Sequence, residues 1–132
     1  MVNQFHGTWG RRVVTFQTDA MIATILFLRP NKRCSWHYHK TAFNQFYVIK
    51  GRVYVKSDIG PEGELNTTQL DEGHVFTVQP GVRHEFSTDT LGAVVEEIAY
   101  VKYDASDIYR EVLGGNVESP KIQGEGVQHQ WP

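Results

Sequence analysis

Short runs of β-branched and aromatic residues recur between turn signals, and helical periodicity is nearly absent before residue 104. This pattern predicts strands near 12–16, 21–28, 35–39, 45–50, 52–57, 75–78, 84–87 and 92–103. Gly51 predicts a tight hairpin between the fourth and fifth of these strands, and Pro80-Gly81 predicts a second turn. Many short strands of this kind are typical of an all-β barrel or sandwich.

The end of the chain has a different pattern. In "DASDIYREVLGG", Ile108 and Val112 stand four residues apart and Gly114 follows as a stop signal, which predicts a short C-terminal helix at about 105–113. Residues 116–132 are polar and aperiodic, which predicts either a loose tail or an arm ordered by a partner subunit. With 132 residues, we expect one domain over 1–132, with the barrel at about 10–103.

Charge and composition exclude several classes of partner. Thirteen basic and fifteen acidic side chains give a formal charge of −2, which argues against nucleic acid and anionic membranes as partners. The longest apolar run, at 20–28, is too short to span a bilayer. The single cysteine, Cys34, cannot form an internal disulfide, and the N-terminus lacks the pattern of a signal peptide. We therefore expect a cytoplasmic protein.

Three histidines form the candidate metal site. Alternate residues of a strand share a face, so His37 and His39 should project together. His84 follows the Pro-Gly turn and begins a strand that could lie opposite them in a closed barrel. Three neutral imidazoles suit one divalent transition metal: zinc, iron, nickel or manganese. A His-x-His pair standing alone is just as readily a chance surface pair.

The spacing of these histidines resembles two motifs of the cupin superfamily. The first motif runs Gly, five residues, His-x-His, three or four residues, Glu, six residues, Gly; here Asn44 stands at the Glu position and Gly51 closes the motif. The second runs Gly, five residues, Pro-x-Gly, two residues, His; here Gly73 to His84 keep every spacing, with Gln79 in place of the first proline. The similarity covers about 20–100.

The resemblance implies a double-stranded β-helix, a jelly-roll-like barrel that is frequently a homodimer. It also implies a metal in the barrel mouth, held by the positions that match the motif: His37, His39, Asn44 and His84. Asn31 stands where the first motif begins with glycine, a mild change because Asn tolerates positive φ. Asn44 is a larger change, because the metal loses its anionic ligand and should bind more weakly.

Gln45 is the alternative fourth ligand. If Asn44 faces inward, so do Phe46 and Val48, whereas an inward Gln45 would bring Tyr47 with it. The first set fills a barrel interior better, so the alternation favours Asn44.

Within the cupins, the chain resembles the C-terminal barrel of type II phosphomannose isomerases and similar sugar-phosphate cupins. The similarity lies in "GTWGRRVVTF", "FLRPNKRCSWHYH" and "VVEEIAYVKYDASDIYR". It implies metal-assisted isomerisation of a small sugar or sugar phosphate through an enediolate, which needs a base. Glu96 and Glu97 are neighbours in a predicted strand, so one must face the interior, as a base or substitute ligand. A salt bridge or a barrel-end charge is the alternative role for this pair.

Substrate contacts are predicted at the barrel mouth. Arg29, Arg33 and Arg83 could bind a phosphate there or simply solvate the rim, and Tyr47 could stack on a sugar ring or fill core. Two other functions stay open. A three-histidine site without a carboxylate resembles the iron centre of dioxygenase cupins, and a noncatalytic sugar-binding cupin would use Trp36, Tyr38, Tyr47 and Tyr54 as aromatic walls.

Overall fold

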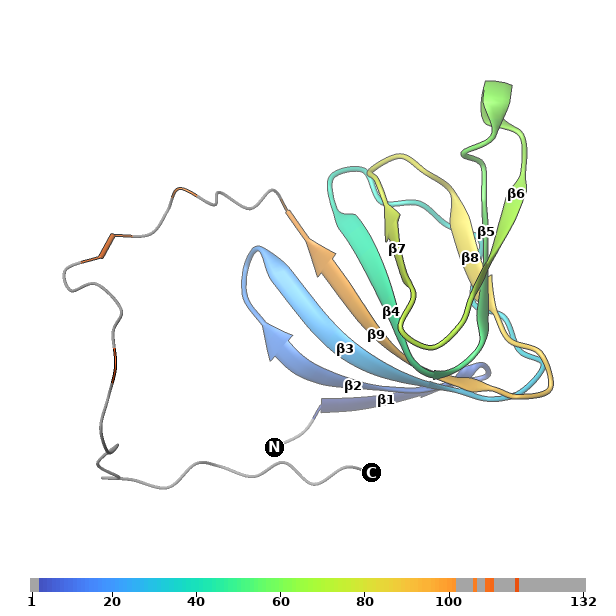
Figure 1. The fold of residues 1–132 in the computed structure, drawn as a ribbon, viewed down its shortest axis with the longest axis horizontal. Helices are drawn as coiled ribbons and strands as arrows, with labels where there is room; N and C mark the ends of the chain where they lie inside the picture. The colour runs from blue at the N-terminus through green and yellow to red at the C-terminus, as the bar shows by residue number, and fades with distance from the viewer. Residues whose placement is uncertain (1–2, 102–105, 107–108, 111–115, 117–132) are drawn as a thin grey trace. The chain divides into compact units, whose positions relative to one another are not determined.

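The computed structural model describes residues 3–101 together with Ser106, Tyr109, Arg110 and Asn116, and the side chains of 3–6 are not part of this description. The chain divides into two units, Met1–Lys102 and Tyr103–Pro132. The strands of the described residues all belong to the first unit (Figure 1). The predicted helix at 105–113 and the predicted tail at 116–132 lie outside the described residues, apart from the four isolated positions named above.

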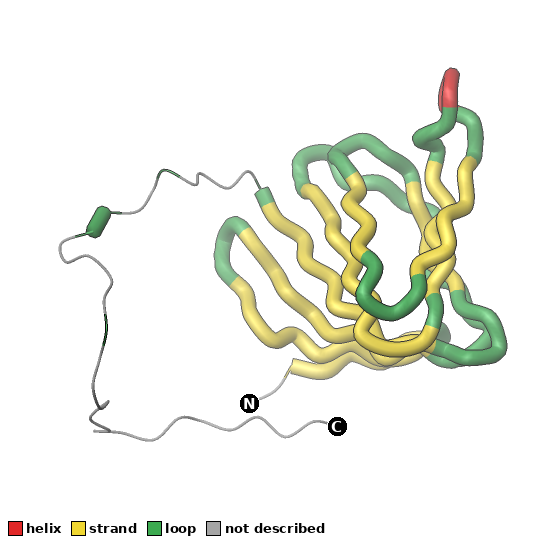
Figure 2. Tube along the Cα trace, in the orientation of Figure 1, coloured by secondary structure: helices red, strands yellow, loops and turns green. Residues whose placement is uncertain are grey.

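Two antiparallel sheets build the first unit. The larger has the strand order β1-β2-β3-β9-β4-β7 and the smaller has the order β6-β5-β8. Their bounds are β1 Asn3–Gly7, β2 Gly10–Gln17, β3 Met21–Leu28, β4 Phe43–Gly51, β5 Val53–Ser57, β6 Asn66–Leu70, β7 Val75–Val78, β8 His84–Ser87 and β9 Ala93–Tyr100, with a short 3₁₀ turn at Pro61–Gly63. Figure 2 shows how far strands dominate the unit. The predicted all-β fold is confirmed, and no helix in the described part of the chain could cross a membrane.

The core lies between the two sheets. Alternate residues of β4 and β5 point inward, so that Phe46, Val48, Val53 and Val55 are each at most 1% exposed. Strand β9 adds Val95 from the neighbouring position in the larger sheet. The remaining members of this buried cluster are Leu26, Leu28, Cys34, Leu70, Val78 and Phe86. This apolar layer fixes which face of each strand is interior, and so it orients the site residues described below.

The predicted hairpin at Gly51 is wrong. Strand β4 pairs with β7 and β9, whereas β5 pairs with β6 and β8, so Gly51 is a corner where the chain passes from one sheet to the other. Its φ of 83° lies in the left-handed region, and a Cβ there would overlap the carbonyl oxygen of Gly92. A tight glycine turn between two strands does not reveal whether those strands pair.

The predicted strand at 35–39 is also wrong. The segment touches β8 only through two isolated bridges, Arg33 with Ser87 and His37 with His84. Four positions separate Arg33 from His37 but only three separate Ser87 from His84, so the two bridges are not in one regular register, and no ladder joins them. Strands β1 and β6 were not predicted, because as edge strands of sequence NQFHG and NTTQL they carry little apolar pattern.

Candidate metal centre

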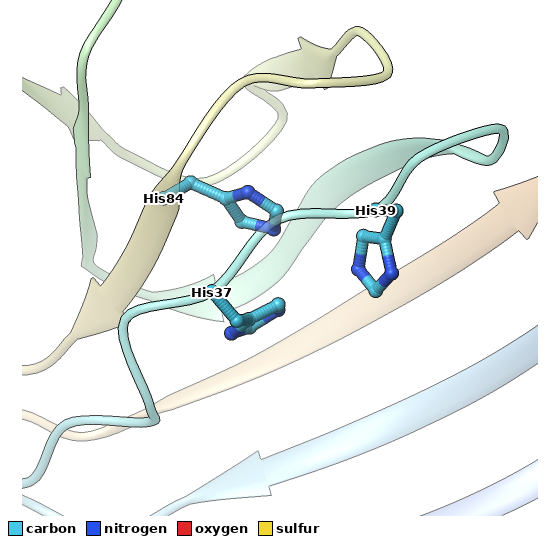
Figure 3. A group of neighbouring side chains, drawn as sticks. All are labelled: His37, His39 and His84. Atoms are coloured by element: carbon cyan, nitrogen blue, oxygen red, sulfur yellow. The ribbon is translucent and has the colours of Figure 1, made fainter.

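Three imidazoles converge where the irregular segment meets β8. His84 is the first residue of β8, and its amide donates to the carbonyl of His37 at 2.8 Å, while the amide of His37 donates back at 3.1 Å. The amide of Gly81 holds the carbonyl of His39 at 2.7 Å. One potential ligand nitrogen from each of the three rings lies within 4.8 Å of the others. Figure 3 shows the three rings gathered in one region, His84 from β8 and the other two from the segment before β4.

Hydrogen bonds on the far side of two rings orient them. Nδ1 of His84 lies 3.0 Å from the carbonyl oxygen of Val82, so Nδ1 carries the proton and Nε2 keeps its lone pair. Nδ1 of His37 lies 2.9 Å from the carbonyl oxygen of Ser35 and 3.0 Å from its hydroxyl. Burial lowers the pKa of both His39 and His84, which favours the neutral form that binds a metal.

Three buried atoms around this centre have no hydrogen-bond partner among the described residues: Nε2 of His39, Nε2 of His84 and Oδ1 of Asn44. Such atoms are costly to bury unless something satisfies them. Asn44 is 3% exposed on the inner face of β4, as its alternation with Phe46 and Val48 predicts. Three imidazole nitrogens and one amide oxygen form a donor set that fits a divalent first-row metal ion.

Glu97 lines the same cavity as His37 and His39. Asn44 Nδ2 donates to Glu97 Oε2 at 3.3 Å, which leaves Oδ1 of the amide without a partner. Burial raises the pKa of Glu97, opposed by the charges of Arg12 and His37 and by the hydrogen bond from Asn44. Glu96 occupies the opposite face of β9, where its register partner on β4 is the exposed Tyr47. The glutamate that faces the interior is therefore Glu97.

The cavity has a volume of about 340 Å³. Its lining consists of Trp9, Arg12, Ile22, Leu26, Cys34, Ser35, His37, His39, Asn44, Phe86, Glu97 and Ala99. Burial raises the pKa of the Cys34 thiol to about 11, so this lining residue is a neutral thiol at physiological pH. The other ionisable residues of the lining are Arg12, Glu97, His37 and His39.

None of the four predicted substrate contacts lines this cavity. Arg29 borders a separate groove of about 640 Å³, and Arg33, whose side chain is 73% exposed, forms an ion pair with Glu85. Arg83 pairs with Asp58 at 3.5 Å and stacks over the exposed ring of Tyr38. The expected aromatic walls do not line it either, since Trp36, Tyr38, Tyr47 and Tyr54 are absent from the lining.

Sequence reasoning missed Arg12 as a site residue. Arg12 lies in β2 opposite Leu26 of β3, a core residue, and therefore points to the inner face of the sheet. Its neighbour Arg11 faces outward, with its guanidinium 4.5 Å from the centre of the Phe27 ring. The signal was present as two arginines at the start of an apolar strand, where alternation requires one of them to face inward.

The cupin domain family model matches residues 24–95, more than half of the chain, and this interval contains all three histidines. The chain belongs to the cupin family. A D-lyxose ketol-isomerase from Cohnella laeviribosi is similar to this cupin, with 27% identity over 124 residues that cover 77% of this chain and 68% of the relative.

Two solved structures share the fold. KdgF from Halomonas sp. aligns with a TM-score of 0.59 and 19% identity, covering 71% of this cupin and 80% of that chain. A variant of oxalate decarboxylase from Bacillus subtilis aligns with a TM-score of 0.67 and 18% identity, covering 76% of this cupin and 27% of that chain. Identities this low support the barrel architecture and leave the function to be argued from the site.

Proposed function

We propose that this cupin binds one divalent metal ion and isomerises a small sugar or sugar derivative, with Glu97 as the base. The observation that carries the proposal is a half-buried carboxylate, Glu97, in the cavity that His37 and His39 line. His37, His39 and His84 would hold the metal, with Oδ1 of Asn44 as the fourth protein ligand. The similarity to a D-lyxose ketol-isomerase supports a sugar as the substrate.

The chemistry needs a group that polarises a carbonyl and a group that moves a proton. When bound, the metal would polarise the sugar carbonyl and so lower the energy of the enediolate. Glu97 would remove the proton from C2 and return it to C1, while the proton of the O2 hydroxyl passes to O1, which interconverts aldose and ketose. Burial raises the pKa of Glu97 and so strengthens it as a base, while the amide of Asn44 holds its carboxylate in place.

Proton exchange at C2 tests this proposal. Metal-loaded protein in D₂O should incorporate deuterium at C2 of D-lyxose or a similar sugar, measured by NMR. Glu97→Gln should reduce exchange at least about 100-fold, the usual contribution of a general base. Glu96→Gln is the matched control, because Glu96 lies on the opposite face of the same strand and should leave exchange intact. Equal losses in both variants would contradict the assignment of the base.

One observation favours a second function. The three clustered ligands are all imidazoles, and no carboxylate among the described residues belongs to the cluster. A neutral set of this kind also suits a ferrous centre that activates oxygen. Oxygen uptake by ferrous-loaded protein with candidate substrates would support the dioxygenase, and C2 exchange without oxygen uptake would support the isomerase.

The resemblance of this chain to the C-terminal barrel of type II phosphomannose isomerases stays a prediction.

A further inference from the structure

We infer that the groove bordered by Arg29 is a second binding site, which takes a small aliphatic carboxylate. The aliphatic chain lies on an apolar floor, and the carboxylate meets Arg29 and Lys50. The groove has a volume of about 640 Å³ and shares no lining residue with the histidine cavity. The site therefore does not depend on the proposed isomerisation.

The groove lies on the outer face of the larger sheet. Strands β2, β3, β9 and β4 run side by side there (Figure 1), and one residue of each belongs to a continuous row of register partners: Arg11, Phe27, Val94 and Lys50. Leu26 lines the histidine cavity and Phe27 the groove, so the two sites are on opposite faces of the sheet. Neighbouring strands are about 4.8 Å apart, so the backbones of the two cations that end the row are about 14 Å apart.

The apolar floor of the groove is open to a ligand. Leu91 is 65% exposed, and Phe27 and Val94 are only partly buried. Pro30 extends this surface beside the row. Small-molecule sites typically have volumes of about 300–1,000 Å³ and mostly apolar walls, with a few polar groups that orient the ligand. The size and the lining of the groove match this description.

The charges of the groove are complementary to an anion. Its charged lining residues are three cations and one carboxylate: Arg11, Arg29, Lys50 and Glu72. The guanidinium of Arg11 lies 4.5 Å from the centre of the Phe27 ring, and Glu72 accepts a hydrogen bond from a backbone amide at 3.3 Å. The side chains of Arg29 and Lys50 form no hydrogen bond, ion pair or ring contact within the described part of the chain. These two exposed cations are therefore available to a carboxylate.

Ligands that differ in one feature test the inference. In calorimetric titrations, octanoate should bind at least about fivefold more tightly than octanol, because one partly exposed charge pair contributes about this factor. Octylammonium should bind more weakly than octanol, because it meets like charges. Raising the salt concentration from about 0.01 M to about 1 M should remove most of the difference between octanoate and octanol. Equal affinity for octanoate and octanol at low salt, or no saturable binding of octanoate, would overturn the inference.

The length of the acid tests the apolar floor. From hexanoate to octanoate to decanoate, each step should tighten binding by about threefold to fifteenfold, where the upper figure corresponds to complete burial of two methylenes. Acetate has the charge without the chain and should not bind measurably. Acetate that binds as tightly as octanoate would contradict a role for the floor.

Charge variants locate the carboxylate. Arg29→Gln/Lys50→Gln should bring the affinity for octanoate down to within about twofold of the affinity for octanol. Lys32→Gln/Lys40→Gln is the matched control, because it removes two exposed cations that lie outside the groove, and it should leave the difference unchanged. A preference that persists in Arg29→Gln/Lys50→Gln, as binding in the histidine cavity would give, would refute the site. Equal losses in the two double variants would refute it as well.

Apolar variants locate the chain. Leu91→Ser should weaken the binding of octanoate and of octanol alike, by at least about threefold. Leu65→Ser is the control, because Leu65 is 64% exposed and lies outside the groove, and it should change neither affinity. Equal effects of the two substitutions would refute the contact with Leu91.

A second copy of this chain is the other occupant that the groove could receive. Sedimentation velocity separates the two cases, because a ligand in an open groove leaves the oligomeric state unchanged. The sedimentation coefficient should therefore be the same with and without saturating octanoate. Conversion of a dimer into monomers by octanoate would show that a second copy occupies the groove, and it would overturn the inference.

Discussion

Replacing Asn44 by glutamate restores the residue usual at this position of the cupin motif, and the structure predicts that it destabilises the metal-free protein. Asn44 is 3% exposed and donates a hydrogen bond to Glu97 Oε2 at 3.3 Å. Glutamate cannot donate that bond when it is ionised, and it places a second carboxylate beside Glu97. The buried neutral amide of Asn44 and the half-buried carboxylate of Glu97 therefore act as a pair.

The expected cost follows from the distance. A lost hydrogen bond to a charged group costs about 1.5–3 kcal/mol. Two like charges about 3.3 Å apart add about 5 kcal/mol at an effective dielectric constant of about 20. Protonating one carboxyl instead costs about 4 kcal/mol at about pH 7.5, since its usual pKa is about 4.3. Protonation of one carboxyl group has the lower energy, so we expect Asn44→Glu to lower the free energy of unfolding by about 3–5 kcal/mol.

Urea unfolding in the presence of EDTA measures this cost. A proton held by the carboxyl pair raises a folded-state pKa above its unfolded value, so the destabilisation grows as pH rises and shrinks as pH falls. When the pH is lowered from about 7.5 to 5.5, the difference in free energy of unfolding between the variant and the wild type should shrink by up to about 2.7 kcal/mol. Added metal should also reduce this difference in free energy of unfolding, because the new carboxylate can become a ligand.

The double variant Asn44→Glu/Glu97→Gln supplies the control. In this variant the carboxylate is at position 44 and the amide at position 97, so the pair again has one of each. The double variant should therefore recover most of the lost stability. A double-mutant cycle should then give a coupling energy of several kcal/mol. If the two single effects add to within about 0.5 kcal/mol, the two side chains do not interact in solution and the reasoning fails.

Four further predictions follow from the same contacts. Because burial raises the pKa of Glu97, the wild type should lose stability relative to Glu97→Gln as pH rises above the ordinary value of 4.5, and parallel urea midpoints from pH 4.5 to 8 would contradict this. Burial lowers the pKa of His39 and His84, so protonation should weaken metal binding only when the pH falls below 6.5, the usual histidine pKa. Competition with a chelator measures this metal affinity, and an affinity that stays constant down to pH 4.5 would exclude imidazole ligands. Cys34, with a pKa of about 11, should react with Ellman's reagent at pH 8 at least about tenfold more slowly in the native protein than in urea. Gly51→Ala should lower the free energy of unfolding by more than about 2 kcal/mol, because the corner needs positive φ and has no room for a Cβ, and an unchanged urea midpoint would count against that corner.

Local sequence patterns predicted the parts of the site that depend on spacing. The cupin motif spacing selected the three histidines that the structure brings together. Asn31 has a φ of 56°, the conformation expected where the motif has glycine. Alternation along β4 correctly turned Asn44 inward with Phe46. These features depend on a few neighbouring residues, whose pattern is readable in one sequence.

Features that depend on distant pairing could not be predicted in the same way. The segment with His37 is no strand because it meets β8 only at two isolated bridges, and the residues of each bridge are about fifty positions apart in the sequence. Gly51 joins two sheets because β4 finds partners in β7 and β9, which no local turn signal encodes. The predicted arginine contacts failed to reach the cavity for the same reason, while Arg12 reached it through its pairing with β3.

Metal stoichiometry tests the central claim most directly, that three imidazoles from two segments hold one divalent ion. After dialysis against micromolar zinc, manganese, nickel or ferrous iron, elemental analysis of the wild type should find one equivalent per chain for at least one metal. His84→Ala should bind none, while His74→Ala should keep the full equivalent, because His74 is exposed and lies outside the cluster. A full equivalent in His84→Ala, or no bound metal in the wild type under any of these conditions, would contradict the account.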